Sequence, residues 1–328
     1  MYGCPALSKK PGDKRNTSRY KPGSSPSMSE TPSAQSNTDW TIGRLLDWTR
    51  QHFQQRDIDE PRLCAELLLA RALDCQKIVL YTRLEQTPSN QQRACFRNLV
   101  KAAAEHQPIA YLIGHKEFYS LDFAVTPDVL IPRPETELLV ELALAFFATA
   151  SRDRLDLLDV GTGSGCLAIT IAKRNPTVRA VATDISEAAL KVARQNAEKH
   201  QVADRLTFVR ADMLDLPSDV TPDGRFDLIV SNPPYVPEQD RSSLPANVRD
   251  HEPDVALFGG SDGLDAYRAI AAGAHNRLRP GGVLLLEVGH DQAEQVESLF
   301  ADASPLQIDG RHKDLAGIER VVQLTLPA

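Results

Sequence analysis

The chain has 328 residues, of which 42% are hydrophobic and 25% are charged, and its formal net charge at pH 7 is −7. This composition is typical of a globular protein, and the length suffices for one large domain and a smaller one. The acidic balance argues against a protein that holds nucleic acid by bulk electrostatics, because phosphate neutralisation requires clustered Lys and Arg. No direct DNA binding is expected, and a protein partner or a small ligand suits the charge better.

The five cysteines include no Cys-x-x-Cys pair and have no metal-ligand spacing with the eight histidines, so no metal site is expected. No apolar run approaches the roughly 18 residues that a membrane-spanning helix needs, and no export signal follows the N-terminus. These features predict a reduced, cytoplasmic setting with no membrane partner.

Residues 1–38 are rich in Ser, Pro, Lys and Asn and have almost no large aliphatic side chains. Such a segment cannot bury enough apolar surface to offset the entropy of ordering, so we predict a disordered basic extension. The segment contains six Lys and Arg but only two Asp and Glu, and contact of this basic segment with ribosomal RNA is one alternative. A start of the protein at Met28 is another.

The next segment, 39–105, is predicted to form a small all-helical domain. Its apolar residues recur with a period near 3.6, as in amphipathic helices. Thr41 precedes the first helix in an N-cap position, Pro61 suits the first turn of the second, and Ser89 caps the last. A short third helix is expected over 77–84.

From residue 106 the pattern changes. The segment 106–131 contains an alternating apolar pattern over 113–125, which predicts a β-hairpin linker. The segment 132–328 then alternates strand patterns with helix patterns. Strands are predicted over 155–160, 179–183, 206–209, 226–231 and 283–288. Helices are predicted over 135–147, 166–174, 187–200 and 264–276.

This repetition predicts an α/β fold with a mostly parallel sheet and helices on both faces. The tail, 306–326, is expected to add an antiparallel pair at the edge. Ligands of such sheets bind beyond the carboxyl ends of the strands, so the residues that follow each strand are the candidates for a site.

A glycine-rich turn directly follows the first of these strands and precedes a helix. It consists of Gly161, Thr162, Gly163, Ser164 and Gly165. Glycine lets a backbone turn tightly and approach a ligand closely. The spacing is not that of a dinucleotide fingerprint, and the turn lacks the Lys-Ser/Thr of a P-loop, so a pyrophosphate is not the favoured ligand. A plain connector remains an alternative.

Asp184 ends the next strand, 19 residues after Gly165. An acidic side chain at this place can accept hydrogen bonds from both ribose hydroxyls of a nucleoside. An ordinary turn or N-cap residue is the alternative interpretation.

With these two features the segment 155–326 resembles the class I S-adenosylmethionine-dependent methyltransferases, which have a Rossmann-like sheet with one antiparallel strand. The resemblance implies that the segment 161–165 lies against the methionyl part of S-adenosylmethionine and that Asp184 holds its ribose. It also implies that Asp212 and Met213 flank the adenine, with Met213 as an apolar wall. An ordinary core methionine remains open for Met213.

The fourth strand runs into the tetrapeptide Asn232, Pro233, Pro234 and Tyr235. The two prolines fix φ and supply no N–H, so the turn is rigid and its carbonyls are free to accept. Together with the side-chain carbonyl of Asn232 they can accept both hydrogens of a planar amino group, while Tyr235 covers its face. A plain strand-ending turn is the alternative.

Two acceptors that bind both hydrogens of an amino group suit methyl transfer to an amide. The amide nitrogen is a poor nucleophile because its lone pair is delocalised. Two acceptors that hold its hydrogens orient the lone pair and stabilise the positive charge that develops on nitrogen. No strong general base is then needed, and no histidine is assigned as one.

The remaining motifs resemble the release factor glutamine methyltransferase family over about 40–322. They lie at 61–69, 107–114, 129–137, 252–253 and 256–260, and include Arg133-Pro134-Glu135-Thr136-Glu137. The resemblance implies a helical N-terminal domain that docks a class 1 peptide-chain release factor, and methylation of the glutamine in its Gly-Gly-Gln loop. It also implies that 133–135 lies near the active site, although a helix start with N-terminal acids is an alternative.

Three other functions are alternatives. A ribosomal-protein glutamine methyltransferase shares the tetrapeptide but usually lacks the Arg-Pro-Glu-Thr-Glu run. An adenine-N6 methyltransferase needs a base-flipping pocket and a basic surface, which an acidic chain does not supply. A binding protein with an inactive methyltransferase fold is disfavoured because the cofactor and acceptor motifs are intact.

Overall fold

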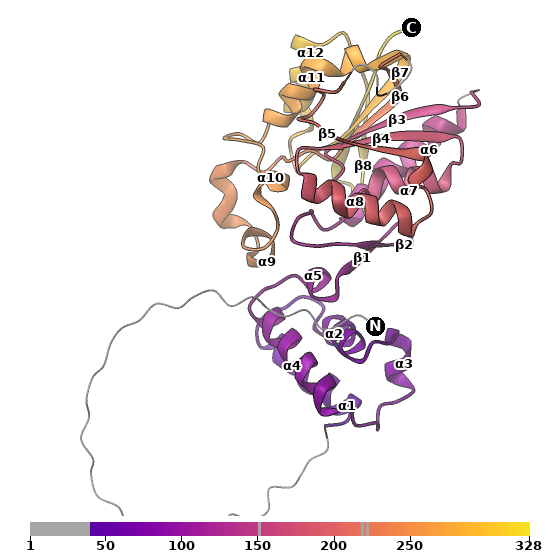
Figure 1. The fold of residues 1–328 in the computed structure, drawn as a ribbon. Coiled ribbons are helices and arrows are strands. Elements are labelled where there is room, and N and C mark those ends of the chain that lie inside the picture. Colours follow the sequence, from indigo (N-terminus) through magenta and orange to yellow (C-terminus); the bar gives the residue numbers. More distant parts are fainter. Residues whose placement is uncertain (1–39, 150–151, 218–219, 221–222) are drawn as a thin grey trace, which may run out of the picture. The chain divides into compact units, whose positions relative to one another are not determined.

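The computed structural model describes residues 40–149, 152–217, 220 and 223–328 (Figure 1). The extension predicted over 1–38 lies outside the described residues. The chain divides into two compact units, Met1–Glu105 and His106–Ala328, and each is described by itself.

The described part of the first unit is helical. Its helices are α1 (Ile42–Gln54), α2 (Pro61–Leu73), α3 (Lys77–Tyr81) and α4 (Asn90–Ala104). Thr41 caps α1 by accepting a hydrogen bond from the backbone N–H of Arg44, and Pro61 occupies the first turn of α2. Ser89 forms a capping box with Gln92 at the start of α4. The local signals in the sequence therefore fix where these three helices begin.

The third helix is shorter than predicted, because α3 ends at Tyr81 and not at residue 84. The backbone N–H of Gly43 donates to Leu84 O, and that of Ile42 donates to Gln86 O. The chain thus leaves the helix to pair with the start of α1. No local pattern encodes this pairing between segments far apart in the sequence.

The second unit begins with a short helix and the predicted hairpin. These elements are α5 (Ile109–Ile113), β1 (His115–Phe118) and β2 (Leu121–Ala124), with β1 and β2 antiparallel. The two turn residues, Tyr119 and Ser120, have φ values of 49° and 60°. Two successive positive φ values twist the turn in the sense that a tight hairpin requires. Ile113 lies in α5 and not in the first strand.

A seven-stranded sheet forms the centre of this unit, in the order β5-β4-β3-β6-β7-β9-β8. The strands are β3 (Leu155–Val160), β4 (Val178–Asp184), β5 (Leu206–Arg210), β6 (Phe226–Ser231), β7 (Leu278–Glu287), β8 (Gln307–Lys313) and β9 (Glu319–Thr325). Only β9 runs antiparallel to its neighbours. The predicted fold class, a mostly parallel sheet with one antiparallel strand, a hairpin and a helical N-terminal region, is confirmed.

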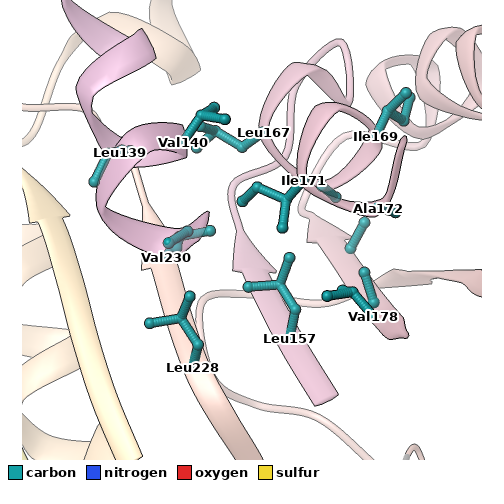
Figure 2. Packing of buried hydrophobic residues seen from close by; sticks show 14 of the residues in the cluster. Leu139, Val140, Leu157, Leu167, Ile169, Ile171, Ala172, Val178, Leu228 and Val230 are labelled. Atoms are coloured by element: carbon teal, nitrogen blue, oxygen red, sulfur yellow. The ribbon is translucent and has the colours of Figure 1, made fainter. Parts of the chain in front are cut away.

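Helices cover both faces of the sheet. One face packs against α6 (Glu137–Thr149), α7 (Cys166–Arg174) and α8 (Glu187–Lys199), and the other against α11 (Asp265–Arg277) and α12 (Ala293–Ala303). Figure 2 shows the first face, where Leu157 and Val230 of the sheet meet Ile171 of α7 and Val140 of α6. Leu158, next to Leu157, belongs to the core on the opposite face, as the two-residue period of a strand requires.

Some elements differ from the predictions. A 3₁₀ turn, η1 (Pro134–Thr136), precedes α6, which therefore begins at Glu137. Strand β7 begins at Leu278, five residues before the predicted start, and it continues through Gly281 because the N–H of Gly281 donates to Leu326 O beside β9. The helix α12 was not predicted.

The remaining short elements are η2 (Ala203–Arg205), η3 (Glu238–Ser243), α9 (Ala246–Arg249) and α10 (Asp254–Leu257). Across the described ranges, no helix combines the length and the apolarity that crossing a bilayer would take.

A buried asparagine on α8 joins three parts of the second unit. Asn196 has no exposed surface. Its Oδ1 accepts from the N–H of Ala124 at 2.7 Å, and its Nδ2 donates to Ala124 O at 3.0 Å and to Ser164 O at 2.9 Å. The hairpin and the glycine-rich turn are thereby tied to one side chain.

Replacing this side chain will destabilise the unit. Asn196→Ala leaves the part-buried N–H of Ala124 and two carbonyls without partners, so the free energy of unfolding should fall by about 2 to 4 kcal/mol. Urea denaturation measures the change. Glu198→Ala, at an exposed position of the same helix, should change it by less than about 0.5 kcal/mol. Equal effects of the two substitutions would contradict the assigned role.

Candidate active site

A cleft of about 450 Å³ opens at the carboxyl ends of β3, β4, β5 and β6. Ligands of parallel sheets bind at this edge, and the volume lies within the range of small-molecule sites. Nine of the residues predicted for a site line it: Gly161, Thr162, Gly163, Ser164, Asp184, Asp212, Met213, Asn232 and Pro234. Gly165, Pro233 and Tyr235 are not among the lining residues. A wider groove, about 1010 Å³, lies on the first unit and contains none of these residues.

The glycines of the turn after β3 serve two different purposes. Gly161 and Gly163 have φ values of 71° and 54°, and a Cβ at either would meet no atom within 4 Å. These two glycines therefore allow a backbone conformation that other residues rarely adopt, and they border open space. Gly165 also has a positive φ, but a Cβ there would lie 2.6 Å from Ile169 Cδ1 and 3.2 Å from Ala193 Cβ. Gly165 therefore allows α7 and α8 to pack closely and does not face the cleft.

Asp159, the next-to-last residue of β3, fixes the glycine-rich turn that follows this strand. It is fully buried, and its Oδ2 accepts hydrogen bonds from Thr162 Oγ1 at 2.7 Å and from the N–H of Ala168 at 3.1 Å. Burial raises its pKa to about 6, although these two donors favour the charged form. No local signal in the sequence indicates this role of Asp159, because only the folded turn brings Thr162 and Ala168 around it.

Asp184, at the end of β4, faces the turn. Its Oδ2 accepts from the N–H of Gly163 at 2.9 Å, and its Oδ1 accepts from that of Ser186 at 2.9 Å. Burial raises the pKa of its carboxyl group, and the backbone N–H groups oppose that rise. Each carboxylate oxygen has two acceptor sites, so both oxygens can still accept a hydrogen bond from a ligand.

Met213 follows β5 and lines the cleft together with Asp212. Its φ is 45°, and it is partly buried against the core that contains α11. The same side chain therefore packs on the core and forms part of the cleft wall.

Asn232 follows β6 directly. The preceding Ser231 is buried and donates from Oγ to Val160 O at 2.8 Å, which fixes the end of β6 beside the turn after β3. Asn232 Nδ2 donates to Thr136 Oγ1 at 3.1 Å. Within the described residues no hydrogen bond reaches Asn232 Oδ1, so this carbonyl is available to accept at the cleft.

The Pro-Pro-Tyr segment is clamped by a second loop. Val236 N donates to Leu257 O at 2.9 Å, and Gly259 N donates to Val236 O at 3.0 Å. A Cβ at Gly259 would lie 2.4 Å from Pro234 O. The conformational rigidity predicted from the prolines is therefore reinforced by backbone pairing with the segment 256–260.

Two further contacts hold Tyr235. Gln292 Nε2 donates to Tyr235 O at 3.0 Å, and a Cβ at Gly263 would lie 2.3 Å from the same oxygen. Burial raises the pKa of the Tyr235 phenol to about 12, so it stays neutral near pH 7. Tyr235 O is bonded and Pro234 O lies against Gly259, whereas within the described residues no hydrogen bond reaches Pro233 O, although Pro233 is buried and does not line the cleft.

Two motifs that lie far apart in the sequence meet at the rim. Glu252 is buried and accepts from Arg133 Nη2 and, at 3.2 Å, from the N–H of Ile131. Arg133 lines the cleft, whereas Glu135 does not. The resemblance had singled out both motifs, but nothing in their spacing indicates that they form an ion pair. In the part of the chain that the structure describes, no group of three or more His, Cys, Asp or Glu could hold a metal ion.

The close approach at Gly263 can be tested by stability. Gly263→Ala and Gly281→Ala both place a side chain at positive φ, 78° and 76°, which should cost about 1 to 2 kcal/mol each. Only Gly263→Ala also overlaps Tyr235 O, so it should cost a further 1 to 3 kcal/mol, roughly. Urea denaturation measures both values. Equal destabilisation by the two substitutions would show that Gly263 does not hold the turn.

Two protein families match segments of this chain. The family described as "PrmC N-terminal domain" matches residues 44–114, and that described as "Methyltransferase domain" matches residues 151–312. Among solved structures, the hMettl16 catalytic domain in complex with MAT2A 3′UTR hairpin 6 is similar, with a TM-score of 0.52 at 13% identity over 70% of this chain and 83% of that one. This likeness concerns the fold alone.

Curated relatives are closer in sequence. A release factor glutamine methyltransferase of Rhodopirellula baltica is 40% identical over 299 residues, which cover 90% of this chain and 99% of that protein. One of Geobacter sulfurreducens is 41% identical over 283 residues, 86% of this chain and 96% of that protein. Since both likenesses span nearly the full length of the relatives, this chain belongs to the release factor glutamine methyltransferase family, and it is an enzyme.

Proposed function

We propose that this enzyme transfers a methyl group from S-adenosylmethionine to the side-chain amide nitrogen, N5, of the glutamine in the Gly-Gly-Gln loop of a class 1 peptide-chain release factor. The observation that carries the proposal is the orientation of Asn232. Its Nδ2 is engaged by Thr136, and its Oδ1 is left to accept at the cleft. A second acceptor, Pro233 O, follows in the same turn.

The residues of the cleft fit S-adenosylmethionine. Asp184 can accept from the ribose hydroxyls with both oxygens, since the N–H groups of Gly163 and Ser186 leave acceptor capacity on each. Gly161 and Gly163 border open space, which suits the methionyl part. Met213 offers an apolar wall to the adenine. When bound, S-adenosylmethionine supplies a methyl group on an electrophilic sulfonium.

The protein then acts by positioning and electrostatics. Asn232 Oδ1 and Pro233 O accept the two hydrogens of the substrate amide, which turns the nitrogen lone pair toward the methyl group and stabilises the charge that grows on nitrogen. The ring of Tyr235 is proposed to cover the face of the amide, although it is not among the residues that line the cleft. The proton leaves to solvent after the transfer.

The proposal also assigns roles to the parts of the chain. The helical segment 39–105 docks the release factor, 106–131 is the linker, and 132–328 carries the reaction. Two of the similar proteins bear the name release factor glutamine methyltransferase, which supports this choice over a ribosomal protein or adenine as substrate. A cytoplasmic setting follows from such a substrate and remains a prediction, as does the role of 1–38.

One experiment tests the substrate. The enzyme is incubated with labelled S-adenosylmethionine and with separate pools of release factor, ribosomal protein and DNA. Peptide mass spectrometry should show one added methyl on the glutamine of Gly-Gly-Gln, and none when that glutamine is replaced by glutamate, because a carboxylate has no amide nitrogen. A methyl group on adenine or lysine would refute the proposal.

Asp184→Ala should weaken the affinity for S-adenosylmethionine by about 1 to 3 kcal/mol, because ribose hydroxyls lose a buried partner. Isothermal titration calorimetry measures the change, and thermal unfolding verifies that the variant is folded. Asp204→Ala, at an exposed position before β5, serves as the control and should bind normally. Unchanged affinity in folded Asp184→Ala would remove this residue from the site.

Asn232→Ala should lower kcat by on the order of a hundredfold or more, because it removes an acceptor that acts on the transition state. The affinity for S-adenosylmethionine should fall much less than kcat does. Single-turnover assays with saturating cofactor and release factor separate the two effects. A variant that turns over at the native rate would show that the acceptor assignment is wrong.

A further inference from the structure

A buried carboxyl group that the proposed reaction does not use lies behind the site. Glu287 is the last residue of β7, next to β6, and is 3% exposed. Its Oε2 has no hydrogen-bond partner within the described residues. A charged group is rarely kept in such a place without a function, because burial penalises the charge and leaves acceptor capacity unused.

Thr136 connects this carboxyl group to Asn232. Thr136 lines the cleft but is only 3% exposed, so its hydroxyl group is largely shielded from water. Its Oγ1 accepts the hydrogen bond from Asn232 Nδ2 at 3.1 Å. The same hydroxyl group interacts with the carboxyl group of Glu287 and favours its charged form.

The direction of these hydrogen bonds follows from the inventory of donors. A hydroxyl group has one hydrogen, and a carboxylate can only accept. While Glu287 is charged, a hydrogen bond between the two groups requires Thr136 to donate, so that Thr136 can only accept from Asn232. The amide of Asn232 must then turn its Nδ2 toward Thr136. Its Oδ1 consequently faces the cleft, which is the orientation that the proposed reaction needs.

If Glu287 carried a proton, the direction could reverse. The carboxylic acid could donate to Thr136, whose own hydrogen could then go to Asn232 Oδ1. The amide would be flipped, and it would present a donor to a substrate amide that itself offers donors. Such a complex is unproductive because both partners carry hydrogens at the contact.

We infer that Glu287 is a positioning residue that acts through the hydroxyl group of Thr136 to hold the amide of Asn232 with Oδ1 toward the substrate. The inference rests on the proposed function, since it explains how Asn232 comes to present an acceptor. It adds two residues to the machinery that do not lie at the reacting atoms: Thr136, which is part of the cleft wall, and Glu287 behind it.

Charges on several elements set the titration of Glu287. The charges that act on Glu287 are those of Arg320 on β9 and of Arg133 and Glu135 before α6. The charge of Glu287 in turn acts on Tyr235 after β6, Tyr267 on α11 and Cys166 on α7. Burial is the largest effect and raises the pKa of Glu287 to about 7, whereas Thr136 and Arg320 oppose the rise. The charged, orienting form therefore gains population as the pH increases through about 7.

The first test compares two substitutions of Thr136. Thr136→Val is nearly isosteric and lacks the hydroxyl group, so kcat should fall roughly tenfold, the effect of one lost hydrogen bond. Thr136→Ser keeps the hydroxyl group and should retain most of the native kcat. The affinity for S-adenosylmethionine, measured by calorimetry, should be native in both. A Thr136→Val enzyme as active as Thr136→Ser would overturn the inference.

The second test follows kcat from about pH 6 to about pH 8. The native enzyme should become faster as the pH rises through about 7. Glu287→Gln cannot titrate and can both donate and accept, so its kcat should be several-fold lower at about pH 8 and should lack this rise. Glu294→Gln, at an exposed position of α12, is the control and should keep the native profile. The same rise in Glu287→Gln would overturn the inference.

The two proposals fail in different ways. If native enzyme adds no methyl to the glutamine of Gly-Gly-Gln, the proposed function is wrong. If native enzyme adds it, but neither the Thr136 pair nor the Glu287 profile behaves as expected, the function holds and the positioning network does not. Should Thr136→Val fail to fold in a thermal scan, the pH profile of Glu287→Gln decides.

Discussion

The parallel pairing of three strands is the constraint on which the site depends. Strand β3 pairs with β4 through Val160 and Thr183 and with β6 through Val160 and Ser231, so all three end at one edge. The glycine-rich turn, Asp184 and Asn232 follow these ends directly. The hydrogen-bond ladder of the sheet therefore brings together the carboxylate proposed to bind the nucleoside and the proposed amide acceptor, although 48 positions separate them in the chain.

Rigidity around the tetrapeptide comes from several sources that act on one short segment. The prolines restrict φ, Ser231 ties the end of β6 to β3, and the glycines at 259 and 263 let a second loop approach the carbonyls of the turn. A site that works by orienting an amide needs this, because a small displacement of an acceptor weakens the stabilisation of the transition state. The loop that follows the tetrapeptide thus supports the turn, and part of it also lines the cleft.

Buried carboxyl groups support the site from the side of the core. Asp159 holds the turn after β3, Glu252 holds Arg133 and the chain before it, and Glu287 interacts with Thr136. Burial raises the pKa of Asp159 and of Glu287. Each of these side chains interacts with a turn or loop segment and restrains it. The surrounding fold supplies the energy that keeps these charges buried.

The sequence by itself determined the elements whose signals are local. Caps at Thr41 and Ser89, the period of the strands, the glycine-rich turn and the Asn-Pro-Pro-Tyr turn each depend on residues a few positions apart. The fold class and the cleft residues at the ends of β3, β4, β5 and β6 could therefore be predicted. Only the tertiary structure decided that Gly165 packs helices, that α3 stops at Tyr81 and that Arg133 meets Glu252. It also decided that Thr136 lies between Asn232 and Glu287. These contacts join residues from tens to more than one hundred positions apart, and the packing of the sheet and its helices, which no local pattern encodes, brings them together.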